Sequence, residues 1–87
     1  MNRAEILQGI LKILKRYEGR GANRSPLTES TSLAKELDID SARMVDIVLD
    51  VEQAFGVTVD DASLPNLETV KDVVDLVEGL LKPQKGS

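Results

Sequence analysis

The 87-residue sequence predicts a small all-α fold: a four-helix bundle with three long helices, one short helix and a long first loop. Three segments carry apolar residues at helical spacing, and no segment alternates like a strand. Leu, Ile, Val and Phe supply 27 residues, which is too apolar a composition for a disordered chain. The length suits one small domain, and because Tyr17 and Phe55 are the only aromatic residues, the core must be aliphatic.

The first helix is predicted over residues 3–17, with its charged side chains facing solvent. Its apolar positions are Ile6, Leu7, Ile10, Leu11, Ile13, Leu14 and Tyr17. Gly19 and Gly21 are expected to end it, because glycine tolerates the left-handed conformation at helix C-termini.

A long connection follows the first helix. Residues 18–31, which include Ser25-Pro26, are predicted to form a loop that Leu27 anchors to the core. Residues 32–37 are expected to form one or two helical turns with Leu33 and Leu37 on a common side. A connection of this length lets the first and second helices pack without a tight hairpin.

The second helix is predicted within residues 37–56, where a polar opening at residues 38–41 leads into about four turns of helix-compatible sequence without proline or glycine until Gly56. Its start is well marked. Asp40 and Ser41 stand just ahead of the apolar-periodic segment, where a side-chain oxygen caps the unpaired amides of the first turn. We therefore expect Ser41 at or beside the positive end of this helix, with Gly56 as its C-cap. The predicted core face consists of Met44, Val45, Ile47, Val48, Leu49, Val51, Ala54 and Phe55, and the predicted solvent face of Arg43, Asp46, Asp50 and Gln53.

The last third of the chain is predicted to hold a short extended link, a brief helix and the final long helix. Val57 and Val59 are expected to alternate inward, and residues 60–64 to form a brief helix that Pro65 halts. Thr69 and Asp72, three residues apart, approximate a capping box. The apolar side of the final helix consists of Val70, Val73, Val74, Leu76, Val77, Leu80 and Leu81.

Composition excludes several classes of function. The net charge is +4 over residues 1–24 and −8 over the remainder, so the acidic part that holds the second helix is not expected to bind nucleic acid. The absence of Cys and His excludes a disulfide, a thiolate nucleophile, an ordinary zinc site and a serine–histidine triad. Asp38 and Asp40 alternate like calcium-loop ligands, but Arg43 and Leu49 replace the required glycine and glutamate. Neither catalysis by this chain alone nor a metal site is expected.

A further set of residues stands out around the second helix. They are Asp40-Ser41, Val45, Asp46, Val48, Glu52 and Phe55-Gly56-Val57. In this order they resemble the second helix of acyl carrier proteins, and the resemblance extends over most of the chain, from the amphipathic first helix to the final helix after residues 68–70. The chain departs from the family at Ala42, where leucine is usual, and at Arg43, where an acid is frequent.

The resemblance implies a carrier that does no catalysis itself. Taken alone, a serine at a helix start is ordinarily a cap. The family instead implies that Ser41, with Asp40 beside it, receives a covalent 4′-phosphopantetheine arm from coenzyme A. A phosphopantetheinyl transferase attaches the arm, loading ligases and acyl-transfer enzymes use its thiol, and the expected pathway is fatty acid, other lipid or secondary-metabolite synthesis. The residues expected to contact partner enzymes are Asp38, Arg43, Met44, Asp46, Asp50 and Glu52.

Shelter for the cargo is a further expectation. It would place Val45, Leu49 and Ala54 opposite Val59, Leu64 or Leu67. The departures at Ala42 and Arg43 indicate a specialised carrier with dedicated partners. Two alternatives stay open: a carrier of aminoacyl or peptidyl groups, and an unmodified helical adaptor.

The remaining expectations concern organisation. Residues 1–82 are predicted to form a single carrier domain and residues 83–87 a flexible tail. No apolar run is long enough to span a membrane and no secretory signal is found, so we expect a cytoplasmic monomer without a membrane partner. Ser41→Ala is expected to abolish loading and to cost at most about 0.5 to 2 kcal/mol through a lost cap.

Overall fold

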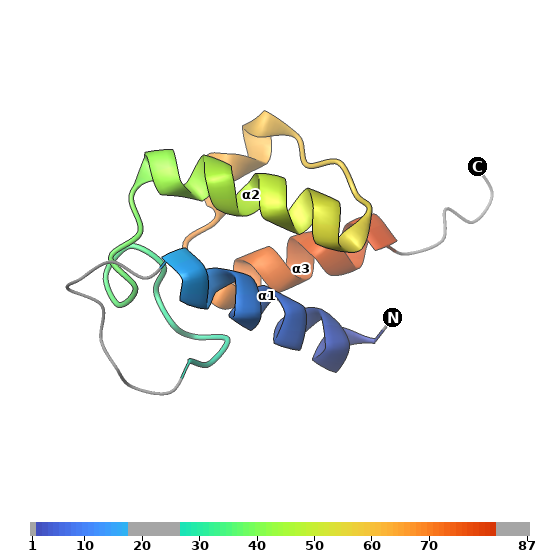
Figure 1. Ribbon diagram of the computed structural model, residues 1–87, viewed down its shortest axis with the longest axis horizontal. Coiled ribbons are helices and arrows are strands. Elements are labelled where there is room, and N and C mark those ends of the chain that lie inside the picture. Colours follow the sequence, from blue (N-terminus) through green and yellow to red (C-terminus); the bar gives the residue numbers. More distant parts are fainter. Residues whose placement is uncertain (1, 18–26, 82–87) are drawn as a thin grey trace.

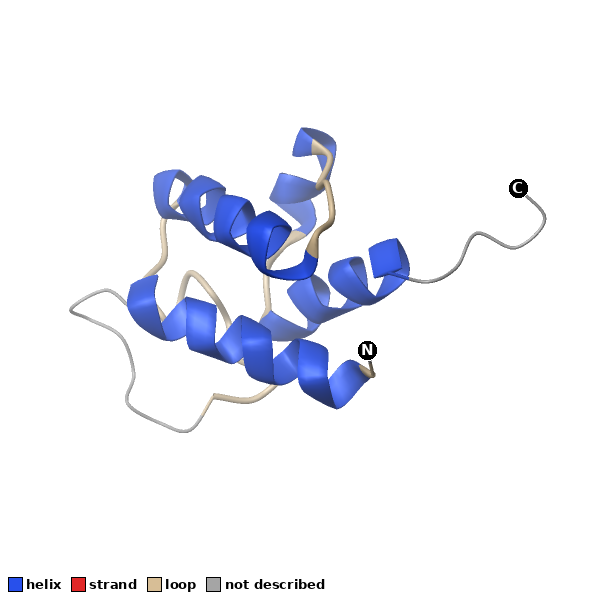
Figure 2. Ribbon diagram, turned by 45° about the vertical axis from the view of Figure 1, so that its right-hand side comes forward, coloured by secondary structure: helices blue, strands red, loops and turns tan. Residues whose placement is uncertain are grey.

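Four helices make up the regular structure of the residues that the structure describes. The computed structural model describes residues 2–17 and 27–81, and its helices are α1 (Arg3–Tyr17), α2 (Ser41–Phe55), the 3₁₀ helix η1 (Asp61–Asn66) and α3 (Val70–Leu81). Within these ranges the only β pairing is an isolated bridge between Ser32 and Thr69. The predicted all-α bundle of three long helices and one short helix is therefore confirmed (Figure 2).

The long helices lie side by side, with α1 packed against both α2 and α3 (Figure 1). The chain runs along α1 in one direction and returns along α2 and then α3 in the opposite direction (Figure 1). As predicted, the core is aliphatic. Its helical residues are Ile6, Ile10, Ile13 and Leu14 of α1, Ile47 and Val51 of α2, and Val70, Val73, Val74 and Val77 of α3.

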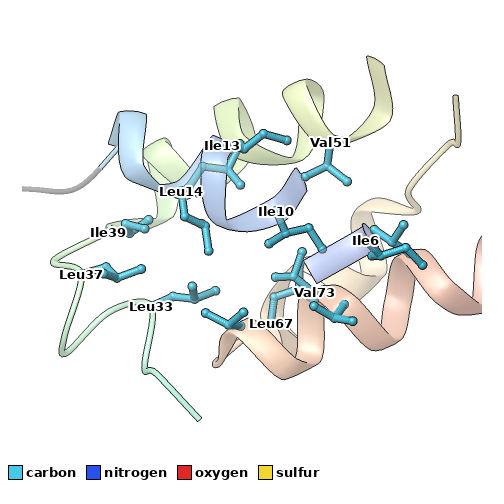
Figure 3. Packing of buried hydrophobic residues seen from close by; sticks show 14 residues of the cluster. Ile6, Ile10, Ile13, Leu14, Leu33, Leu37, Ile39, Val51, Leu67 and Val73 are labelled. Atoms are coloured by element: carbon cyan, nitrogen blue, oxygen red, sulfur yellow. The ribbon is translucent and has the colours of Figure 1, made fainter. Parts of the chain in front are cut away.

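The connection before α2 contributes to this core as much as a helix does. Leu33, Leu37 and Ile39 are buried there, and their side chains join Leu14 and Leu67 in the same cluster (Figure 3). Leu27 packs against the cluster from its edge, as expected for an anchor. The burial of apolar side chains gives this non-helical segment a fixed position, which general loop composition would not indicate.

The one or two helical turns expected over residues 32–37 are reduced to a single hydrogen-bonded turn. The Ser32 carbonyl accepts from the amides of Glu36 (3.0 Å) and Leu37 (3.2 Å), and no helix continues from it. Leu33 and Leu37 are nevertheless both buried, so their predicted common orientation toward the core holds.

Backbone hydrogen bonds fasten the same connection to the start of α3. The Leu33 amide donates to the Glu68 carbonyl (2.9 Å), and the Val70 and Lys71 amides donate to the Thr31 (3.1 Å) and Glu29 (2.8 Å) carbonyls. The first amides of a helix have no partner inside it, and here the connection supplies two of those partners.

Thr69 and Asp72 form the predicted capping box at the same helix start. The Asp72 amide donates to the Thr69 hydroxyl (3.3 Å), and the Thr69 amide donates to the Asp72 carboxylate (3.0 Å). This reciprocal pair fixes the first turn of α3.

Two expectations about chain boundaries have different outcomes. The predicted stop at Pro65 is wrong, because Pro65 lies inside η1 and the helix continues to Asn66. In so short a 3₁₀ helix the missing amide of proline removes a single internal hydrogen bond. The expectations for Gly19, Gly21, Ser25-Pro26 and residues 83–87 lie outside the described residues.

Arg3 gathers three carboxylates where α1, the connection and α3 meet. Its guanidinium pairs with Glu29, with Asp75 (2.7 Å) and with Glu78 (3.3 Å), and Lys71 also reaches Asp75 (3.0 Å). Hydrogen bonds from Lys71 and then from Arg3 hold the pKa of Asp75 below its ordinary value. A carboxyl whose pKa is lowered in the folded state stabilises the fold above its unfolded-state pKa and loses that contribution in acid.

We expect Asp75→Asn to lower the melting temperature near neutral pH, because the substitution removes one anion from this cluster. The difference from the parent chain should shrink as the pH falls below about 4, where unfolded aspartate is protonated. Thermal unfolding of both proteins between pH 3 and pH 7 measures it, with Asp46→Asn as a control at an exposed carboxylate. A difference that does not depend on pH would contradict this account of Asp75.

Candidate functional site

The start of α2 is capped by Asp40, whose backbone is extended (φ −90°, ψ 178°). Its carboxylate accepts from the Arg43 amide (2.8 Å), and its carbonyl accepts from the Met44 amide (3.0 Å). Ser41 is therefore the first residue inside the helix rather than its cap. Its hydroxyl is not needed to hold the first turn, which corrects the stability cost expected from a lost cap.

Asp38 sets the approach of the chain to this cap. It has a positive φ of 54°, a left-handed conformation that aspartate tolerates better than most residues. Its side chain is exposed, while Ile39, the next residue, is buried in the core. The turn at Asp38 thus lets the chain bury Ile39 and then present Ser41, which is also exposed.

A groove of about 740 Å³ opens beside Ser41. It runs between the connection, the first turns of α2, the end of η1 and the approach to α3. Its described lining is formed by residues 32–35, 39–41, 44–45, 64–65 and 67–69. Such a volume lies within the range of pockets that hold small ligands.

The groove differs in part from the predicted cargo shelter. Val45, Leu64 and Leu67 do line it, as expected, but Leu49, Ala54 and Val59 are not among the described residues that do. The connection supplies much of one wall through residues 32–35 and Ile39, which sequence reasoning did not assign to the site. Leu33 and Leu37, which the sequence places on a common side and the structure buries, could have indicated that this segment is part of the packed structure.

The outward face of α2 carries apolar side chains that were predicted to be buried. Val45 is 47% exposed and Leu49 50% exposed, and Ala54 is exposed as well, while Ile47 and Val51 are fully in the core. The prediction was wrong for these three residues. A helix packed against its neighbours on one side cannot bury eight apolar residues spread around most of its circumference.

The residues expected to contact partner enzymes are not equivalent in the structure. Arg43 and Asp46 are exposed on α2, whereas Met44 is half-buried, packs against the core and lines the groove. Asp50 and Glu52 are also half-buried. Asp46, Val45 and Leu49 therefore form an exposed patch on α2, called here the α2 patch.

Asp50 and Glu52 each hold a group of their own chain. The Tyr17 hydroxyl donates to the Asp50 carboxylate (2.6 Å), which joins the end of α1 to α2. This hydrogen bond, with burial and the negative charges of Asp50 and Asp46, raises the pKa of the Tyr17 phenol above its ordinary value. The Glu52 carboxylate accepts from the Val59 amide (2.7 Å).

Across residues 2–17 and 27–81, no cluster of three or more His, Cys, Asp or Glu side chains is arranged to hold a metal ion. In the same ranges no helix has the length and apolar character needed to cross a membrane.

The structure thus defines a small helical protein in which a capped helix start presents an exposed serine beside a groove. Comparison with known proteins identifies the family to which such a protein belongs. The family described as "Phosphopantetheine attachment site" matches residues 8–77. An acyl carrier protein of Thermotoga maritima is 40% identical over 88% of this chain and 93% of its own length.

Two further relatives agree. A meromycolate extension acyl carrier protein of Mycobacterium leprae is 40% identical over 87% of this chain and 64% of its own length. The crystal structure of a Toxoplasma-specific mitochondrial acyl carrier protein superposes with a TM-score of 0.76 at 25% identity, covering 94% of each chain.

This chain belongs to the acyl carrier protein family. It is a non-catalytic carrier for fatty acid or lipid synthesis on which other enzymes act, and its covalent prosthetic group is 4′-phosphopantetheine. The site fits such a group, because Ser41 offers an exposed hydroxyl at the start of a 15-residue helix and lines a groove next to it.

Proposed function

We propose that the Ser41 hydroxyl is the attachment point of the phosphopantetheine arm. One observation carries this assignment: Ser41 is exposed at the start of α2 and at the edge of the groove, while Asp40 does the capping. The Ser41 oxygen is thus available to react without loss of the helix start. Asp38 and Asp40, which precede it, are proposed to be recognised by the transferase.

In the attachment step the Ser41 oxygen bonds to the phosphorus that carries the pantetheine arm of coenzyme A. The pyrophosphate bond breaks, adenosine 3′,5′-bisphosphate leaves, and the serine proton passes to a base of the transferase. The product is a phosphodiester at a helix N-terminus, where unpaired amides and the helix dipole favour an anion by roughly 0.3 to 1 kcal/mol. The attached group supplies the thiol that this cysteine-free chain lacks.

The groove is proposed to shelter an acyl cargo. Its walls include Leu33, Ile39, Val45, Leu64 and Leu67, and its volume of about 740 Å³ suits an aliphatic guest. These apolar side chains favour a fatty acyl chain as the guest. The same lining also holds polar residues, namely Ser32, Lys35, Asp40, Ser41, Glu68 and Thr69. The loading assay described below therefore decides between fatty acyl and aminoacyl or peptidyl cargoes.

The α2 patch is proposed as the docking surface for partner enzymes. Val45 and Leu49 supply exposed apolar area, and Asp46 adds a negative charge at its edge. Asp38 and Arg43 are proposed as secondary contacts. Asp50, Glu52 and Met44 are less available, because Asp50 accepts from Tyr17, Glu52 accepts from the Val59 amide and Met44 packs against the core. Complementary charge at such a surface governs association rate and choice of partner more than affinity.

Asp46→Lys is expected to slow loading by the transferase roughly 5- to 10-fold at low salt, because the substitution reverses a charge on the docking surface. The difference should narrow as salt is added. Initial rates of loading at two ionic strengths measure it. Asp61→Lys, at an exposed acid of η1, is the matched control. Equal rates for both variants at low salt would contradict docking through the α2 patch.

We also propose that the chain is a specialised carrier with dedicated partners, supported by Ala42 and Arg43 where the family usually has leucine and often an acid. Residues 1–82 are proposed as the carrier domain, acting as a monomer in the cytoplasm. Normal loading and elongation by a general fatty-acid synthase would contradict the specialised role.

Incubation with coenzyme A and a phosphopantetheinyl transferase tests the carrier function directly. The intact mass should rise by one phosphopantetheine group, and the loaded chain should then accept fatty acyl groups from a suitable ligase and refuse amino acids. Acceptance of amino acids alone would favour an aminoacyl carrier. An unchanged mass would favour an unmodified adaptor.

A further inference from the structure

A turn of the connection shares the groove with Ser41. The Ile39 amide donates to the Leu33 carbonyl (3.0 Å), so the chain that leads to Ser41 folds back beside this turn. The Lys35 amide donates to the Ser32 hydroxyl (3.2 Å), which fixes the backbone of Lys35 within the turn. Lys35 and Ser41 both line the groove, so the two side chains open onto the same space although they come from different walls.

The charges around this space are unbalanced. Among the described residues that line the groove, Asp40 and Glu68 are acids and Lys35 carries the one positive charge. Asp38, exposed just ahead of the cap, adds a further negative charge nearby. The arm brings another, because its phosphodiester is bonded directly to the Ser41 oxygen in the proposed product. Loading therefore places a new anion in a space whose lining offers it a single cation.

The Lys35 side chain is available to this anion. It is exposed, and no carboxylate of residues 2–17 or 27–81 lies within ion-pair distance of its ammonium. Arg43 is the cation nearest to Ser41 in the sequence, and it is exposed too, but it does not line the groove. Residues two positions apart on a helix do not face each other, so Arg43 and Ser41 point to different sides of α2.

We infer that Lys35 is the counter-ion of the phosphodiester and holds the root of the arm at the edge of the groove. A lysine ammonium is a compact charge on a flexible stem, so it can stay with the phosphate while the arm moves. The arm then starts at the groove, where the cargo is proposed to be sheltered, and Lys35 acts as a positioning residue. This inference rests on the proposed function, because it needs the phosphodiester on Ser41.

Chemical labelling of lysines before and after loading tests the pairing. Both forms of the parent chain, verified by intact mass, are treated with a water-soluble acetylating ester, and the labelling rate of each lysine is read from its peptide. Loading should slow labelling of Lys35 about two- to fivefold at low salt, because the paired ammonium must first leave the phosphate. Lys12 and Lys15, exposed on α1, are internal controls and should react at unchanged rates.

Added salt should remove the difference at Lys35, since it screens an exposed ion pair. Equal rates at Lys35 in the two forms at low salt would overturn the inference. A slower rate that salt does not change would also overturn it, because the arm would then cover Lys35 without pairing with its charge.

Substitution of Lys35 gives a second measure. Attachment of the arm should raise the melting temperature by about 1 to 5 °C more in the parent than in Lys35→Gln at low salt, as one exposed ion pair does in a domain of this size. Lys35→Arg keeps the positive charge and should behave like the parent. Arg43→Gln removes a cation outside the groove and is the matched control. The same increment in the parent and in Lys35→Gln, or equal losses in Lys35→Gln and Arg43→Gln, would contradict pairing with Lys35.

Failure of this inference is distinguishable from failure of the proposed function. Intact mass shows whether the arm is attached. A chain that gains the arm but shows neither effect refutes the role of Lys35 and leaves the carrier function standing. A chain that gains no mass refutes both.

Discussion

Ser41→Ala should yield a folded chain that gains no mass when it is incubated with coenzyme A and a transferase. The substitution removes the only atom proposed to accept the arm, so the loss of loading is complete. Its effect on stability should be within about 0.5 kcal/mol, since the residue is exposed and Asp40 supplies the cap. Intact mass and chemical denaturation, measured on the same preparation, check both halves.

Asp40→Ala is the matched variant at the neighbouring position. It should cost about 0.5 to 2 kcal/mol through loss of the cap, and it should still reach the loaded mass at the end point because the Ser41 hydroxyl remains. Ser41→Ala should therefore lose loading but keep its stability, whereas Asp40→Ala should lose stability but keep loading. Global unfolding of Ser41→Ala would show that Ser41 is mainly structural, and a mass gain in that variant would remove it as the attachment point.

Leu37→Ala should destabilise the fold by about 2 to 5 kcal/mol, although Leu37 lies outside every helix. Its side chain is fully buried, in the same cluster as Leu33, Ile39 and residues of all three long helices. Truncation leaves a cavity that fixed neighbours on several sides cannot fill. This loss is a large share of the stability of a small domain, and urea unfolding measures it.

Leu49→Ala is the control for the same chemical change on a helix. Leu49 is 50% exposed, so its truncation should change the free energy of unfolding by no more than about 0.5 kcal/mol. We therefore expect truncation of the non-helical Leu37 to cost far more stability than truncation of the helical Leu49. The sequence pattern predicted a buried Leu49, for which truncation would also have been costly. Similar costs for both variants would contradict the burial described for them.

Boundaries set by local chemistry were predictable from the sequence. The bounds of α1 and α2, the left-handed Gly56 (φ 65°) at the end of α2, and the Thr69–Asp72 capping box all depend on residues within a few positions of each other. The same local signals placed Ser41 at or beside the start of α2, whereas its role as the attachment residue came from the family resemblance and stays a prediction. Such signals need no knowledge of which helices pack together.

Features that depend on packing were not predictable in the same way. The apolar pattern of α2 could not say which of its eight apolar residues face α1, so Val45 and Leu49 were assigned to the core. Asp50 and Tyr17 are 33 positions apart in the sequence, and Glu52 and Val59 are 7 positions apart. Only the fold brings the members of each pair together. The groove wall formed by residues 32–35 and Ile39 was not predicted for the same reason, because only the fold brings these residues beside α2 and η1.

The most direct measurement is the location of the added mass. The parent chain is incubated with coenzyme A and a phosphopantetheinyl transferase, digested, and its peptides are sequenced by mass spectrometry. The account predicts one phosphopantetheine group, found only on the peptide that contains Ser41. A group on another serine, or no group despite a transferase that loads a known carrier in the same reaction, would contradict it.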